Sequence, residues 1–258
     1  MDHDELVAQP EQSSTASRRR IVALHDLLEL LRSGMLELQG LMPWSSNYTF
    51  LVSVQSADLG TYAVYKPCKG ERPLWDFPSG TLYKREVAAF LVSEALGWAL
   101  VPPTVLRDGP HGVGSAQLYI DANHEQHYFT LRDRYPLEFQ RMALFDVLIN
   151  NADRKGGHCL IDSEDHIWAI DHGIAFHEED KLRTVIWDWA GEVIPAVFLA
   201  DVERLRDQLD SENSLAKGLA QLLLPREIKA LKRRIERILN KPVFPSPGPG
   251  RSVPWPSI

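Results

Sequence analysis

Apolar residues recur along the chain with two periods, and the change from one to the other divides the sequence. Leucines at helical spacing over residues 21–31 predict an amphipathic helix that ends at Ser33-Gly34. Short runs rich in β-branched and aromatic residues follow, and these are typical of strands. The predicted strands are residues 35–41, 48–54, 62–65 and 115–120. The first half of the chain is therefore expected to be rich in β-structure.

Longer helical patterns interrupt this half once and dominate the second half. Residues 81–96 predict a long helix, with Gly97 as its stop. Residues 136–150 predict another helix, and residues 198–240 are expected to be helical apart from a break near Pro225. The pattern favours an α+β fold, with a small β-rich N-terminal lobe that carries one long helix and a mainly helical C-terminal lobe.

A short hairpin lies between the helices of the second half. Apolar strands at residues 159–161 and 167–170 flank the turn DSED. Antiparallel strands return the chain close to where it left, so Asp153, before the hairpin, and Asp171, after it, are expected to be neighbours. Two adjacent carboxylates repel each other unless a proton or a cation lies between them. A divalent metal that carries nucleotide phosphates would use this arrangement.

Two charged residues of the first half complete a possible site. Lys66 ends the apolar strand YAVYK, so its ammonium group can reach a cleft and needs a counter-charge. Glu86, early in the long helix, is well placed to provide it, and Glu94 in the same helix is its rival. A strand lysine paired with a helix glutamate, a catalytic-loop aspartate and a metal-binding aspartate before glycine are the parts of phosphoryl transfer. The spacings, 20 residues from Lys66 to Glu86 and 18 from Asp153 to Asp171, agree with those of protein kinases.

Five motifs in order carry a family resemblance: SSNYTFLV, YAVYKP, REVAAFLVSEALG with VPPTVL, INNADRKGGHCLI and AIDHGIAF. Over residues 35–176 the chain resembles the phosphatidylinositol 3-/4-kinase superfamily. It is most similar to the type II phosphatidylinositol 4-kinases and the plant gamma-type relatives, and as a whole it resembles a compact actinobacterial and Chloroflexi group within that superfamily. The resemblance implies a bilobal protein-kinase-like fold that binds ATP and Mg²⁺.

The resemblance also implies a role for each matching residue. Lys66 would hold the α- and β-phosphates, and Glu86 would orient it. Asp153 would accept or orient the proton of the attacking hydroxyl, and Asp171 would bind the metal. Small residues in a polar turn would let backbone N–H groups approach the phosphates. This phosphate loop comprises Ser45, Ser46 and Asn47. The adenine would contact a hinge that comprises Gln117, Leu118, Tyr119 and Ile120.

One position departs from the family pattern. Five residues after Asp153 the family has asparagine as a second metal ligand, and this chain has His158. Magnesium prefers oxygen ligands, whereas imidazole suits softer metals. Three consequences are compatible with this substitution: the second metal is missing, Mn²⁺ is preferred, or phosphoryl transfer is weak. His158 is either a metal ligand or a structural residue. We expect the neighbouring His172 to have a packing or supporting role.

Composition narrows the setting of the site. The chain has 258 residues and a formal net charge of -7, which gives no support to a nucleic-acid partner. Its two cysteines, Cys68 and Cys159, form no CxxC pattern, and no apolar run is long enough to span a bilayer, so we expect a cytoplasmic protein without integral membrane association. We expect a disordered segment over residues 1–19, a kinase-like domain over 20–242 with its lobes divided near 121–122, and a Pro-rich tail, outside the core, over 243–258.

The predicted function is ATP-dependent transfer of a phosphoryl group to a hydroxyl acceptor, with a protein or small molecule favoured over a lipid. An ATP-binding scaffold without turnover, a pseudokinase, is the alternative that His158 suggests, and transfer of AMP is a third. The basic run at residues 229–237 is expected to be the solvated face of a helix. The acceptor and the oligomeric state do not follow from the sequence.

Overall fold

A five-stranded antiparallel sheet forms the N-terminal lobe of the structure, a computed structural model that describes residues 22–42 and 47–258. The strands lie in the order β1-β2-β3-β5-β4. Their bounds are β1 Met35–Leu41, β2 Phe50–Gln55, β3 Gly60–Pro67, β4 Thr104–Gly109 and β5 Gly112–Leu118. The predicted strands are confirmed, with ends that differ by a few residues. Strands β3 and β5 are antiparallel neighbours in the sheet, and Lys66 is paired with Ser115.

Helix α1 (Leu24–Ser33) packs on this sheet and gives the lobe its own small core. Leu30 and Leu31 are buried there together with Val52 and Val54 of β2. The helix ends at Gly34, where a Cβ atom would lie 2.7 Å from the carbonyl oxygen of Leu30, so only glycine permits this close turn into β1.

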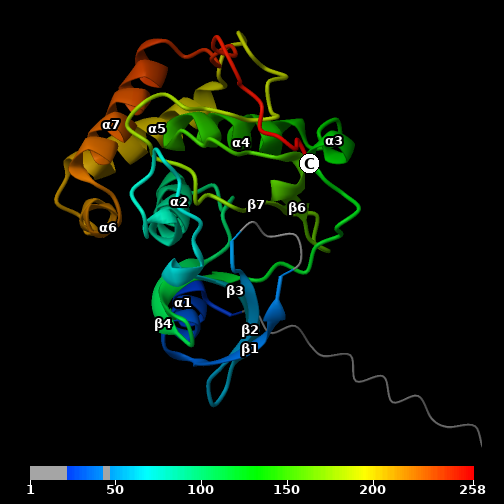
Figure 1. Ribbon diagram of the computed structural model, residues 1–258. Coiled ribbons are helices and arrows are strands. Elements are labelled where there is room, and N and C mark those ends of the chain that lie inside the picture. Colours follow the sequence, from blue (N-terminus) through cyan, green and yellow to red (C-terminus); the bar gives the residue numbers. More distant parts are fainter. Residues whose placement is uncertain (1–21, 43–46) are drawn as a thin grey trace, which may run out of the picture.

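Helix α2 (Leu82–Leu96) is the long helix of the first half, and it packs mainly into the core of the other lobe. It ends at Gly97, which has the left-handed φ of 71° that glycine adopts without cost. Phe90, Val92 and Leu96 are buried in one cluster with the helices of the C-terminal lobe. A helix that is apolar nearly all round is buried on most of its surface, and Figure 1 shows α2 between the sheet and the helical lobe. The C-terminal lobe therefore holds this helix firmly.

Five helices build the C-terminal lobe. They are α3 Tyr128–Leu131, α4 Pro136–Ile149, α5 Ala196–Asp210, α6 Ser214–Leu222 and α7 Pro225–Asn240. The helical segment predicted from 198 to 240 has the expected break before Pro225 and a second one before α6, where the side chain of Asn213 accepts a hydrogen bond from the N–H of Ala216 at 3.0 Å and caps the helix. The α+β, bilobal architecture predicted from the sequence is confirmed.

A short hairpin and the C-terminal segment complete this lobe. The hairpin of β6 (Cys159–Ile161) and β7 (Ile167–Ala169) forms as predicted. The C-terminal segment runs back from the end of α7 across the helical lobe (Figure 1, red). We expected it to lie outside the core, but Phe244 is buried in the main cluster because its backbone pairs with Gly191 and Glu192 at 2.9 Å each. No described helix is long and apolar enough to cross a membrane.

Candidate active site

A cavity of about 370 Å³ is lined by residues of both lobes, and it collects the residues that the sequence singled out. Every predicted site residue that the structure describes lines it. These residues are Asn47, Lys66, Glu86, Gln117, Leu118, Tyr119, Ile120, Asp153, His158 and Asp171. The predicted phosphate-loop residues Ser45 and Ser46 lie outside the described residues. We call this cavity the cleft.

Lys66 lies at the centre of an ion-pair network in the cleft. Its Nζ atom is 2.5 Å from Oε1 of Glu86 and 3.0 Å from Oδ1 of Asp171. Burial alone would lower the pKa of Lys66, but the carboxylates of Asp171 and Glu86 outweigh it and raise the pKa, so the ammonium group stays charged. The predicted pairing of Lys66 with Glu86 is present, and Glu94 does not line the cleft.

Glu86 also connects helix α2 to the segment that carries Asp171. Its Oε2 atom accepts a hydrogen bond from the backbone N–H of His172 at 2.9 Å. The preceding residue, Arg85, donates to the carbonyl oxygen of Ala175 at 2.7 Å and pairs with Glu227 of α7 at 2.5 Å, with both side chains buried. A buried charge is tolerated only when it is paired and hydrogen-bonded. These contacts hold the glutamate helix in the position in which Glu86 reaches Lys66.

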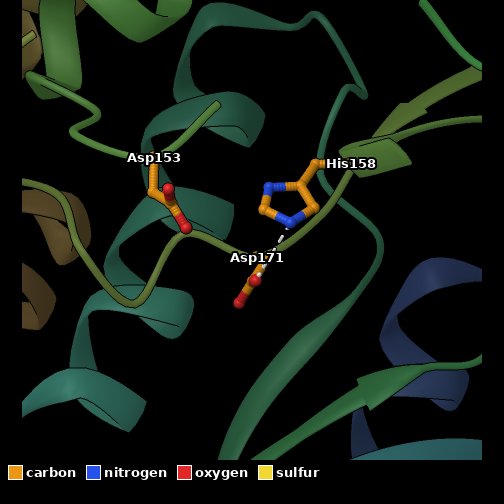
Figure 2. Close-up of side chains that lie close together, drawn as sticks. All are labelled: Asp153, His158 and Asp171. Atoms are coloured by element: carbon orange, nitrogen blue, oxygen red, sulfur yellow. Dashed lines mark ion pairs between the residues drawn. The ribbon is translucent and has the colours of Figure 1, made fainter. Parts of the chain in front are cut away.

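Asp153, His158 and Asp171 form a compact cluster on the other wall of the cleft (Figure 2). One ligand atom from each residue lies within 4.8 Å of the others. Nε2 of His158 is 3.3 Å from Oδ2 of Asp171. Asp153 precedes β6 and Asp171 follows β7, so the short hairpin brings the two carboxylates together as the sequence predicted.

Burial and neighbouring charges set the protonation of this cluster. Burial lowers the pKa of His158 to about 4, so its imidazole is neutral near pH 7 and keeps a lone pair for a ligand. The ammonium group of Lys66 holds the pKa of Asp171 far below its usual range, so that carboxylate is ionised. Burial raises the pKa of Asp153, which makes it a stronger base than an exposed aspartate.

The donor set of this cluster fits a divalent cation. It offers two carboxylates and one neutral imidazole, so oxygen ligands of the kind that Mg²⁺ prefers are combined with one nitrogen ligand. Asp171 also contacts the ammonium group of Lys66 at 3.0 Å.

A buried pair beneath the cluster holds the loop of Asp153, and sequence reasoning missed it. Arg154 and Asp146 are both fully buried, with Nε of Arg154 3.0 Å from Oδ2 of Asp146. Arg154 also donates to the carbonyl oxygen of Ile170 at 2.8 Å, next to Asp171. Asn151 donates to Asp146 and accepts from the N–H of Asp153, which fixes the loop. The sequence does contain an indication of this buried pair. Asp146 is the one acidic residue in the apolar run MALFDVLI, and a buried acid needs a partner.

Two more residues around the loop take part in the arrangement. Lys155, which sequence reasoning did not single out, lines the cleft with Nζ 3.1 Å from Oδ2 of Asp153. His172 is fully buried, and its Nε2 lies 2.6 Å from Nη2 of Arg154. Burial lowers the pKa of His172, so the neutral ring accepts this hydrogen bond. His172 therefore supports the loop through Arg154, which agrees with the packing or supporting role expected from the sequence.

The predicted hinge residues form the end of β5 and the turn after it. The N–H of Leu118 donates to Pro103 at 2.8 Å and that of Tyr119 donates to Tyr62 at 3.0 Å. The buried side chain of Gln117 donates to the hydroxyl of Thr104 at 2.9 Å. Asn47, which also lines the cleft, accepts a hydrogen bond through its side-chain oxygen from the backbone N–H of Arg72 at 2.9 Å. Contact of these residues with a nucleotide remains a prediction.

The sequence is similar to a known protein family and to individual relatives. Residues 102–219 match the family described as phosphatidylinositol 3- and 4-kinase. Protein Rv2133c of Mycobacterium tuberculosis is 40% identical over an alignment of 264 positions, which covers 89% of this chain and 94% of that protein. Phosphatidylinositol 4-kinase gamma 4 of Oryza sativa subsp. japonica is 34% identical over an alignment of 122 positions, which covers 40% of this chain but only 22% of that protein.

Among solved structures, the Golgi casein kinase with Mn/ADP bound is similar in fold. It has a TM-score of 0.56 and 16% sequence identity, with 84% of this chain and 74% of that chain covered. At this identity the likeness supports the bilobal kinase fold alone. The sequence matches and the arrangement of the cleft together place the chain in a family: it belongs to the phosphatidylinositol 3- and 4-kinase superfamily, as a compact member.

Proposed function

We propose that this chain is an ATP- and divalent-metal-dependent kinase that transfers the γ-phosphoryl group to a hydroxyl acceptor. Its family and its fold are those of phosphotransferases. The observation that carries the proposal is the assembled cleft, in which Lys66 contacts both Glu86 and Asp171 while Asp153 lies beside Asp171. Phosphoryl transfer depends on positioning and on stabilising charge, and these are the groups that it uses.

Each group has a part that follows from its position. Lys66, charged and held by Glu86, would bind nucleotide phosphate oxygens. Asp153, whose pKa is raised by burial, would take the proton of the acceptor hydroxyl, and Lys155 beside it would offset negative charge there. Asp171 and His158 would hold the cation, which neutralises charge on the phosphates when bound. The Golgi casein kinase, which is similar in fold, has Mn/ADP bound, which is in line with a nucleotide and a divalent cation as ligands of this cleft.

The acceptor is proposed to be a protein or a small soluble molecule. A lipid acceptor would favour an apolar anchor or a membrane-binding basic surface, and the sequence offers no apolar run of that kind. The name of the rice relative points to phosphatidylinositol, so a lipid fraction belongs among the acceptors tested.

The test is label transfer from ATP in the presence of Mg²⁺ or Mn²⁺. The purified chain is incubated with γ-labelled ATP and, separately, a soluble extract and a lipid extract. We expect label in one of these fractions, and we expect Asp153→Asn to reduce the rate by about 10²- to 10⁴-fold, the usual contribution of a general base. The matched control is Asp165→Asn, an exposed carboxylate in the β6–β7 turn, which should transfer normally.

The same experiment separates the alternatives. Label from α-labelled ATP in the product would indicate transfer of AMP instead of phosphate. An ATP-induced rise in melting temperature with no transfer in any fraction would indicate a pseudokinase, the reading that the kinase relatives do not favour. Equal transfer by the wild type and Asp153→Asn would contradict the role proposed for Asp153.

His158 sets the preferred metal in this proposal. Its imidazole lies 3.3 Å from Asp171, where an oxygen donor would suit Mg²⁺ better. We expect His158→Asn to lower the ratio of the Mn²⁺-supported rate to the Mg²⁺-supported rate by about tenfold, the scale on which metal ligands and their partners act. Rates measured over a titration of each metal provide this ratio. An unchanged ratio would show that His158 is a structural residue and not a ligand.

A further inference from the structure

A second and larger cavity, of about 950 Å³, lies in the C-terminal lobe, and it shares no lining residue with the cleft. It is bounded by α7, by the segment after Asp171 at residues 180–183, and by the C-terminal segment 243–252. We call it the basic groove. Its walls include apolar side chains such as Val147, Ile238 and Phe244.

The charges of the basic groove are one-sided. Six lining side chains are cationic and one, Asp180, is acidic. The cations are Lys181, Arg183, Arg234, Arg237, Lys241 and Arg251. This concentration of positive charge is unexpected in a chain with a formal net charge of -7. Repulsion among like charges is unfavourable unless something compensates for it.

The carboxylates nearby compensate for only part of this charge. Lys181 pairs with Asp76 at 3.0 Å, and Arg237 pairs with Asp180 at 3.0 Å. Within residues 22–42 and 47–258, Arg183, Lys241 and Arg251 form no ion pair. Three cations of the basic groove therefore have no counter-charge in the structure.

Arg234, a further cation of the basic groove, is buried in its wall. We expected it on a solvated helix face, but it is only 4% exposed. Its Nε donates to the carbonyl oxygen of Leu148 at 2.8 Å and its Nη1 to that of His177 at 3.2 Å, while the buried Nη2 has no hydrogen-bond partner in the described structure. A buried guanidinium whose hydrogen bonds go only to carbonyl oxygens is costly, because the nearby carboxylate of Asp180 already pairs with Arg237. An anion in the basic groove would offset this charge.

We infer that the basic groove binds a small ligand that carries two or more phosphate groups. Arginine forks pair with phosphate oxygens in two parallel hydrogen bonds, and lysines add point charge. A volume of about 950 Å³ exceeds the need of one phosphate ion, and the four lining cations that form no ion pair within the described part of the chain exceed the charge of one. The apolar walls would pack against the body that joins the phosphates.

The basic groove also touches the catalytic loop through backbone hydrogen bonds. The N–H of Arg183 donates to Asn151, and the N–H of Arg154 donates to Arg183, at 3.0 Å each. Only the backbone segment of residues 180–183 would therefore separate a ligand in the basic groove from the loop that holds Asp153. The ligand would lie outside the nucleotide cleft.

The test measures binding by calorimetry on the full chain, with inorganic tripolyphosphate as the soluble probe. A second arm uses vesicles of phosphatidylcholine with and without cardiolipin, a lipid whose headgroup carries two phosphates. The test variant is Arg183→Gln/Lys241→Gln. The control is Lys217→Gln/Lys229→Gln, which removes the same charge from exposed positions outside the groove. The ATP-induced shift in melting temperature reports that each variant is folded.

We expect saturable binding either of one tripolyphosphate or of vesicles that contain cardiolipin, and no binding of pure phosphatidylcholine vesicles. In the groove variant the affinity should be lower by about tenfold or more, because charge-assisted contacts are lost. The control should bind like the wild type. Binding of tripolyphosphate alone would identify a soluble ligand, and binding of vesicles alone would identify a headgroup. No binding in either arm, or an equal loss in the two variants, would overturn the inference.

Discussion

Asp171→Asn is expected to abolish measurable phosphoryl transfer, with a loss of about 10³-fold or more. The substitution removes the ionised carboxylate that contacts Lys66 at 3.0 Å and His158 at 3.3 Å, and with it the charge that would hold the cation. Removing a single group that stabilises transition-state charge costs about 10²- to 10³-fold, and losing the metal adds to this. The measurement is the initial rate of γ-phosphoryl transfer at saturating ATP.

The fold should survive this change, so the loss can be assigned to chemistry. Lys66 keeps its partner Glu86 at 2.5 Å. Asp171 has a φ of 63°, and asparagine accepts this left-handed conformation. Asp165, with a φ of 62° and an exposed ion pair, provides a matched control, since Asp165→Asn changes the same atoms in the same backbone conformation. Comparable losses in the two variants would contradict the role of Asp171.

Asp146→Asn is expected to lower the free energy of unfolding by about 3–5 kcal/mol, the cost of breaking a buried ion pair. The fully buried guanidinium of Arg154 would lose its counter-charge. Because Arg154 also holds the carbonyl oxygen of Ile170, next to Asp171, the variant should lose transfer activity at temperatures at which it is still folded. Urea unfolding and the transfer rate measure the two effects.

An exposed pair gives the scale for comparison. Arg134 and Asp165 are paired at 3.2 Å with both side chains more than 60% exposed. Removing such a pair costs about 1 kcal/mol or less, because water and salt screen it. The free energy of unfolding of Asp165→Asn should therefore differ from that of the wild type by about 1 kcal/mol or less. An equally small loss in Asp146→Asn would show that the buried pair does not hold the loop.

Local sequence patterns were enough to predict the helices and strands, and also the side-chain contacts that follow directly from how these elements are connected. The hairpin after Asp153 had to return the chain near its start, so the meeting of Asp153 and Asp171 followed from strand geometry. The pairing of Lys66 with Glu86 followed from a strand end and a helix start that need each other's charge. The bilobal fold followed from the change of hydrophobic period.

Contacts between distant segments could not be predicted in this way. Arg85 of α2 meets Glu227 of α7, 142 residues later, and no local pattern selects that partner. The basic run of α7 looked like a solvated face, yet tertiary packing buries Arg234 within it. Phe244 joins the core from a Pro-rich segment whose composition argued against it. Burial of these residues depends on how the lobes and the C-terminal segment assemble.

We propose that the cleft holds ATP together with a divalent cation at Asp153, His158 and Asp171. This can be measured by equilibrium dialysis against ATP and Mn²⁺, with bound nucleotide and bound metal both quantified. We predict that the wild type and Asp165→Asn retain both, whereas Asp153→Asn/Asp171→Asn binds Mn²⁺ with ATP about 10²-fold or more weakly, since each of the two lost ligands costs about tenfold or more. Equal retention of metal and nucleotide by this double variant would show that these carboxylates do not hold the cation.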